Sequence, residues 1–120
     1  MAKYIRLYHH YQEKYRDVIE FTHQHLKETA SNWPSDYHPW NHPEHRMEHT
    51  LLVLKHSLML AVNRKTDLDV VVLSAILHDV GFYSPERKDH ADEGAKIAEK
   101  YLAEHGYPSD LVEKVVHAVK

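Results

Sequence analysis

A histidine and an aspartate stand side by side at the end of an apolar run, in the segment LSAILHDVG that covers residues 73–81. His78 and Asp79 belong to the side-chain types that most often bind divalent metal ions. A carboxylate at the end of a buried helix also needs a partner, because burying an unpaired charge costs free energy. We therefore interpret this pair as candidate metal ligands.

A third ligand is expected from another helix. Adjacent residues lie about 100° apart around a helix, so His78 and Asp79 can reach one ion only near a helix end. The preceding helix, predicted over residues 44–63, carries His45 and His49 on one face. His49 is the better candidate because it lies deeper in the apolar part of this helix, whereas His45 lies one turn nearer solvent.

Two imidazoles and one carboxylate leave positions on an octahedral metal open for water and substrate. A metal ion in such a site lowers the pKa of a bound water or neutralises a phosphate ester. The structural alternative is that His49 is a core histidine bonded to a carbonyl and that the His-Asp pair is an ordinary surface pair. A histidine on one buried helix, followed by a second buried helix that ends in His-Asp, favours the metal site.

The elements that must position these residues are helices. The chain has only 3 Gly and 5 Pro, which favours long helices over a strand-and-turn fold. Helical periodicity predicts five of them, and Ser109 or Asp110 is expected to cap the last. The predicted ranges are 2–29, 44–63, 68–77, 89–105 and from about 109 to the end of the chain at 120. The fold class expected is all-α, a single-domain bundle of about five helices.

Within this bundle the organisation expected is an N-terminal helix and aromatic, proline-containing loop over residues 1–42, then a helical core over 43–120. The helix over 44–63 is apolar nearly all round and is expected to be deeply buried. The helix over 68–77 is expected to be the most buried, with Thr66 or Asp67 as its cap. The loop over 31–43 is either an apolar plug on the bundle or a lid over a pocket.

Composition excludes several classes of function. Hydrophobic residues make up 42% of the 120 residues and the formal net charge is −3, so no basic footprint for nucleic acid is present. No apolar run is long enough to cross a membrane. Cysteine is absent, which excludes disulfides and thiolate metal sites. No secretory signal is recognisable, and a cytoplasmic location is the simplest expectation.

Three segments resemble the HD-domain superfamily of metal-dependent phosphohydrolases. They are HTLLVLKHSLMLA from His49, LSAILHDVG, and HADEGAKIAEKYL from His90. The resemblance covers residues 43–120. It implies that His49, His78 and Asp79 bind a divalent metal, which the sequence leaves open as Mn, Fe, Ni, Zn, Co or Mg. It also implies that His90 either binds a second ion or contacts substrate.

Other residues take their expected roles from their position relative to this pattern. Lys88 and Arg87, in the loop after the His-Asp pair, either hold a substrate phosphate or are solvated surface charges. His45 and His117 are expected to lie behind the metal ligands and to contact them without binding the metal themselves. The family pattern ends with a further aspartate ligand, for which this sequence offers no counterpart, and Asp110 lies too early. The chain is therefore expected to lack the C-terminal part of the family's core, and the apolar surface of its last helices is expected to favour a homo-oligomer.

The function expected is hydrolysis of a phosphate ester, a nucleotide or small phosphomonoester, by a metal-activated water with Asp79 as the catalytic residue. A small phosphorylated substrate is then the partner, with neither nucleic acid nor membrane. The alternative is a metal- or nucleotide-binding module without turnover, because the final aspartate is absent. The resemblance also allows a di-iron oxygenase, and a purely structural bundle is the least favoured.

Overall fold

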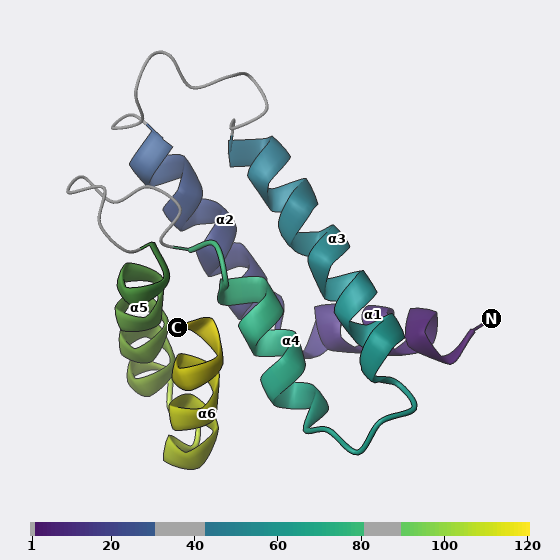
Figure 1. The fold of residues 1–120 in the computed structure, drawn as a ribbon. Helices are drawn as coiled ribbons and strands as arrows, with labels where there is room; N and C mark the ends of the chain where they lie inside the picture. The colour runs from purple at the N-terminus through teal and green to yellow at the C-terminus, as the bar shows by residue number, and fades with distance from the viewer. Residues whose placement is uncertain (1, 31–42, 81–89) are drawn as a thin grey trace.

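The protein, described here from a computed structural model, is all-helical over residues 2–30, 43–80 and 90–120, the part of the chain that the structure describes (Figure 1). The described residues form six helices and no strand. They are α1 (Lys3–Lys14), α2 (Arg16–Ala30), α3 (Pro43–Ala61), α4 (Leu68–Leu77), α5 (His90–Glu104) and α6 (Ser109–Val119). The expected all-α bundle is confirmed.

Most helix boundaries follow from residues that the sequence makes recognisable. Pro43 begins α3, where its missing N–H costs nothing. Asp67 caps α4, because its carboxylate accepts hydrogen bonds from the backbone N–H groups of Asp69 and Val70 at 3.1 and 3.4 Å. Gly106, after the end of α5, has a φ of +77°, a conformation in which glycine is not strained. The cap expected at Ser109 or Asp110 was wrong: Pro108 precedes the first turn of α6, and no side chain caps this helix.

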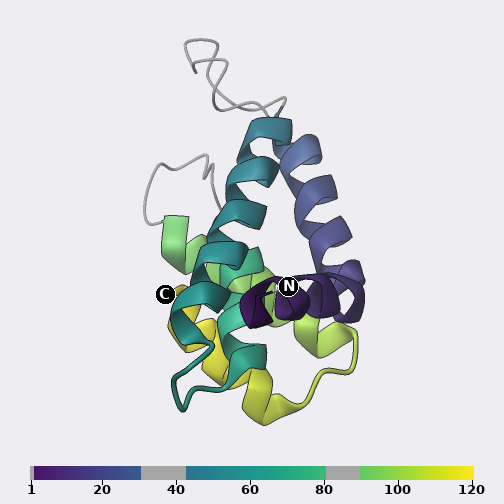
Figure 2. The ribbon, with the colours of Figure 1, turned by 90° about the vertical axis from the view of Figure 1, so that its right-hand side faces the viewer.

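The single helix expected over residues 2–29 is two helices, which is a second correction. The helical path is interrupted at Tyr15, whose φ and ψ are −114° and 33°. The break places the Tyr15 hydroxyl 2.6 Å from Asp69 of α4, where it donates a hydrogen bond, and Lys14 reaches the same carboxylate oxygen at 2.8 Å. The chain thereby changes direction, so that α2 runs beside α3 while α1 crosses next to the C-terminal half of α3 (Figure 2).

The hydrogen bond from Tyr15 to Asp69 predicts a pH-dependent stability. Burial alone acts to raise the pKa of Asp69, but the bonds from Lys14 and Tyr15 outweigh it and hold the pKa below the ordinary 3.8. A depressed pKa means that the stability is present above the unfolded value and is lost as the pH falls through the folded value. We expect Tyr15→Phe to lower the free energy of unfolding by about 1–2 kcal/mol near neutral pH.

This difference between the two proteins should shrink as the pH falls from 3.8 toward the lower pKa of folded Asp69, where the carboxylate becomes protonated. Urea denaturation of both proteins, in a series of buffers from neutral pH down to about pH 2, measures it. A difference that stays constant over the whole series would show that the hydroxyl acts through packing and not through the Asp69 charge.

Helix α4 lies in the middle of the bundle and supplies much of its core, as expected. It packs against α2, α3 and α6, and Val72, Leu73, Ile76 and Leu77 are fully buried. Nearly every residue of α4 is apolar, which suits a helix covered on several sides. Its direction is opposite to that of α3, so the C-terminal end of α4 lies beside the N-terminal half of α3 (Figure 1).

The expectation that α3 is deeply buried was wrong for the face of this helix that points away from the core. Its buried side chains recur with helical spacing along one face, which includes Leu54 and Leu58. The opposite face carries Leu52, Met59 and Leu60, the three large hydrophobic side chains that are exposed among the described residues. Because α3 is apolar nearly all round, its sequence does not indicate which face is covered. These exposed side chains belong to α3 and not to the last helices, where the sequence placed the surface for self-association.

Helices α5 and α6 form a hairpin that contacts α2 through the carboxylate of Asp17 and through a pair of stacked aromatic rings. Asp17 accepts hydrogen bonds from the hydroxyls of Tyr101 at 2.9 Å and Tyr107 at 3.0 Å. Burial, reinforced by this bond, raises the pKa of Tyr107 to about 12, so the phenol stays a donor at physiological pH. The rings of Phe21 and Tyr101 stack with centroids 4.0 Å apart. These contacts hold the hairpin against α2, and α6 packs against α4.

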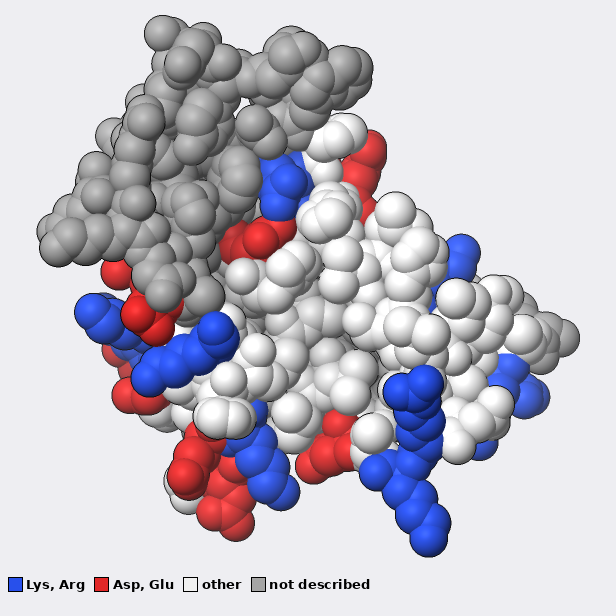
Figure 3. Space-filling model, in the orientation of Figure 1, with Lys and Arg blue, Asp and Glu red and all other residues white. Residues whose placement is uncertain are grey.

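The face seen in Figure 3 has a broad area without Lys, Arg, Asp or Glu, over α3 and α4. A groove of about 860 Å³ lies between α4 and α6. Val70, Val71 and Val116 line it together with charged residues, among them Asp67 and Lys114. Homo-oligomer formation stays a prediction.

No helix of the described residues is long and apolar enough to span a membrane.

Candidate metal centre

The opposed directions of α3 and α4 bring the predicted ligands together. His78 follows directly after Leu77 as the C-terminal cap of α4, and Asp79 is the next residue. His49 lies on α3 between the buried Met47 and Thr50, which hold this part of the helix against the core. The side chains of the buried run in α4 therefore fix the position of the His-Asp pair relative to α3.

The three side chains offer ligand atoms that all lie within 4.8 Å of one another. The Nε2 atoms of His78 and His49 lie 3.4 and 4.0 Å from Oδ2 of Asp79. The two imidazole ring centroids are 5.8 Å apart, with the ring planes at 54°. Asp79 is 20% exposed and His49 is 45% exposed, so the group is partly accessible to solvent.

His78 has the hydrogen bond that a metal-binding histidine needs on its other nitrogen. Its Nδ1 lies 2.6 Å from the carbonyl oxygen of Ala75. A carbonyl only accepts, so Nδ1 carries the proton and donates it. In the neutral ring the lone pair is then on Nε2, the atom that faces Asp79. A backbone carbonyl that fixes the tautomer in this way is typical of histidine ligands, so the residues present fit a divalent ion.

The pKa values of the three candidate ligands are set by their burial and by the charges of their neighbours. Burial acts to lower the pKa of His78, but the hydrogen bond and charge of Asp79 outweigh it, and the pKa is raised above 6.5. Burial acts to raise the pKa of Asp79, yet His78 and Arg46 hold it below 3.8. Burial lowers the pKa of His49, and the neighbouring Arg46 charge adds to this effect. Asp79 is therefore a carboxylate, and His49 favours the neutral form that binds metals.

Comparison with protein families decides which family this arrangement represents. The HD domain model matches residues 46–120, more than half of the chain and the part that contains all three candidate ligands. The chain belongs to the HD domain family. Comparison with curated proteins and with solved structures gave no match. The resemblance that the sequence indicated is confirmed, and HD domain membership supports a metal-dependent phosphohydrolase family as the functional context.

One residue of this HD domain site was missed from the sequence. Arg46 of α3 forms an ion pair and hydrogen bond with Oδ2 of Asp79, and its side chain is only 17% exposed. Arg46 and His49 are three residues apart and therefore share a helix face. Two signals could have indicated Arg46: this spacing from His49, and the need of a largely buried carboxylate for a positive partner.

The two histidines expected to support the ligands lie further from the site. His45 is 49% exposed, and its Nδ1 lies 4.0 Å from Glu48 of the same helix. Its charge contributes to the lowered pKa of His49. His117 is exposed on α6 and lines the groove between α4 and α6, to which none of the three ligand candidates belongs. The supporting role of both histidines stays a prediction.

The remaining predictions for the site fall outside the described residues. Arg87 and Lys88 belong to residues 81–89, and the loop expected to be a lid or a plug falls within 31–42, apart from Pro43. His90 begins α5, at the end of the bundle where α4 ends (Figure 1), but its side chain is not described.

Proposed function

We propose that this HD domain is a metal-dependent phosphohydrolase that acts on a small phosphate ester such as a phosphomonoester or nucleotide. The observation that carries the proposal is the group of His49, His78 and Asp79, whose partly buried side chains offer ligand atoms within 4.8 Å of one another. The family match over residues 46–120 supports the choice of reaction.

Each residue of the site has a separate proposed role. His49 and His78 offer neutral imidazole nitrogens, and Asp79 offers a carboxylate oxygen between them. A divalent ion held there would acidify a water ligand and offset the charge of a phosphate. Asp79 is proposed to orient the attacking water through its second oxygen. Arg46 adds a guanidinium at the same place, and two of its N–H groups could donate hydrogen bonds to two oxygens of a phosphate.

The identity of the metal follows only in part from the donor set. Two imidazoles and a carboxylate suit manganese, iron, cobalt, nickel or zinc, whereas magnesium prefers oxygen ligands. We therefore propose a transition metal, and manganese, iron and zinc are the ions to test first.

Metal binding should weaken as the pH falls. In the metal-free protein the pKa of His78 is raised above 6.5, and at any pH below this pKa the ring must lose its Nε2 proton before it binds a metal. We expect the apparent affinity for Zn²⁺ or Mn²⁺ to fall by about tenfold for each pH unit below this pKa. Isothermal titration across a series of buffers checks it, and an affinity that does not change between about pH 5 and 8 would contradict imidazole ligation.

The reaction itself is tested by phosphate release from a generic ester such as p-nitrophenyl phosphate and from a set of nucleotides. The purified protein is loaded with manganese, iron or zinc, and metal binding is measured on the same sample. Turnover that depends on the metal supports the proposal. Bound metal without turnover of any ester indicates the alternative, a binding module. Oxygen consumption by the iron-loaded protein without phosphate release indicates oxygenase chemistry.

A further inference from the structure

Arg46 and Asp79 neutralise each other at the candidate metal centre. Arg46 reaches across from α3 to Oδ2 of Asp79 at the end of α4, and the two side chains are 17% and 20% exposed. A charge this far removed from water requires an opposite charge or several hydrogen bonds. In the protein without metal, the guanidinium supplies the positive charge that the carboxylate needs.

The guanidinium and a metal ion compete for one atom. Oδ2 of Asp79 is also the oxygen that faces Nε2 of His78 at 3.4 Å and Nε2 of His49 at 4.0 Å. A transition metal binds a carboxylate oxygen at about 2.0–2.2 Å, so it would lie next to the arginine. Two cations cannot both stay on one oxygen without strong repulsion.

We propose that Arg46 is a displaceable counter-ion that holds Asp79 in the metal-free protein and gives up its oxygen when a metal binds. This inference rests on the proposed metal site. It assigns Arg46 two effects of opposite sign: the arginine stabilises the fold without metal, and it weakens the binding of the metal. The bound metal is then exchangeable, because the arginine can take its place on the carboxylate.

The alternative role for Arg46 is that of a positioning residue, which holds Asp79 in the geometry for metal binding and stays bonded to it. The two roles predict opposite results when the charge is removed. A displaceable counter-ion weakens metal binding, so its removal strengthens it. A positioning residue supports metal binding, so its removal weakens it.

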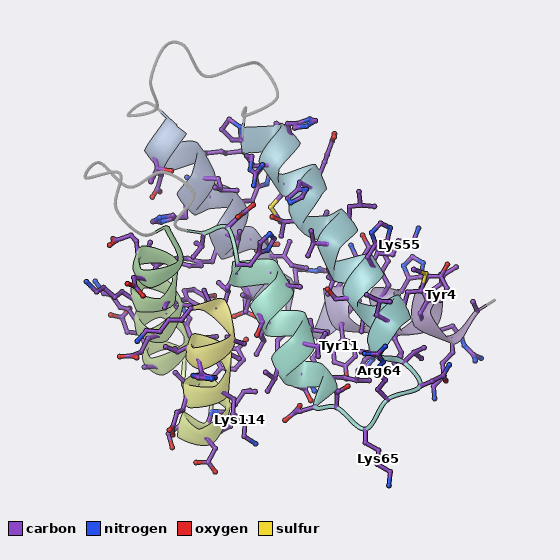
Figure 4. The ribbon with its side chains drawn as sticks, viewed as in Figure 1. Tyr4, Tyr11, Lys55, Arg64, Lys65 and Lys114 are labelled. Carbon is purple, nitrogen blue, oxygen red and sulfur yellow. The ribbon has the colours of Figure 1, made fainter. Side chains whose placement is uncertain are left out.

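The test compares the protein with Arg46→Met, which keeps a long unbranched side chain and removes the charge, and with Arg46→Lys, which keeps the charge. Arg64→Met is the matched control, since Arg64 is exposed and lies past the other end of α3 (Figure 4). Two quantities are measured: the dissociation constant for Zn²⁺ or Mn²⁺ by isothermal titration, and the melting temperature with chelator and with excess metal.

We expect Arg46→Met to bind the metal at least about tenfold more tightly than the parent protein. Its melting temperature should be lower with chelator, and the metal should raise it more than it raises that of the parent. Arg46→Lys should fall between the two proteins, and Arg64→Met should match the parent.

Affinity of Arg46→Met that is equal to or weaker than that of the parent overturns the proposal, while the metal site itself stands. The affinity of Arg46→Lys relative to the parent decides the question if Arg46→Met does not fold. Absence of metal binding in the parent and in both Arg46 variants overturns the metal site and, with it, this inference. The failure of one can thus be told from the failure of the other.

Discussion

Asp79→Asn should abolish metal-dependent phosphate release. We expect turnover to fall by at least about 100-fold when the variant and the parent protein are compared at a manganese concentration that fully activates the parent. The amide keeps the size of the side chain but removes the charge that binds the ion. It also removes the partner to which the two histidines and Arg46 are directed. The measurement is the rate of phosphate release from p-nitrophenyl phosphate or from the best nucleotide of the screen.

Asp110→Asn is the matched control for this experiment. Asp110 is exposed in the first turn of α6 and has no part in the proposed site. We expect it to keep the turnover of the parent, and circular dichroism should show that both variants remain helical. Full activity of Asp79→Asn would exclude the site at the end of α4 as the place of the reaction.

Leu58→Ala should be the most destabilising of the single changes considered on α3. Leu58 is fully buried in the core that α3 and α4 share. Removing most of a buried leucine side chain loses its transfer free energy and leaves a cavity, so we expect the free energy of unfolding to fall by roughly 2–5 kcal/mol. Urea denaturation followed by circular dichroism measures this change.

Leu60→Ala makes the same chemical change two residues further along the same helix, where the side chain is 63% exposed. We expect a change within about 0.5 kcal/mol in the free energy of unfolding. Equal effects of the two substitutions would mean that the outer face of α3 is covered in solution. A dependence of the Leu60→Ala effect on protein concentration would then indicate that a second copy of the chain covers it.

The helix positions could be predicted well because local signals define them. Pro43 at the start of α3, the Asp67 cap of α4 and Gly106 after α5 act on residues close to them in the sequence. The break at Tyr15 could not be predicted, because neither glycine nor proline lies near it. Its hydroxyl contacts Asp69, 54 residues later, and a periodic pattern contains no information on such a contact.

The candidate site was predictable for a related reason. His78 and Asp79 are adjacent, and His49 lies in the helix before them, so a single helix-helix contact is enough to bring them together. Arg46 was missed because an arginine in the first turns of a helix is usually a solvated charge. Only the structure shows that its side chain turns toward the buried carboxylate. The exposed face of α3 escaped prediction because Leu52, Met59 and Leu60 are as apolar as the residues that it buries.

The metal content per chain, measured by mass spectrometry for the parent protein and for His49→Ala, tests the central claim most directly. This claim is that side chains from α3 and α4 hold one ion together. After incubation with manganese or zinc and removal of the excess, we predict about one ion per parent chain and far less on the variant, because the remaining His-Asp pair offers two ligands. Equal metal content in both proteins, or none in the parent, would contradict the claim.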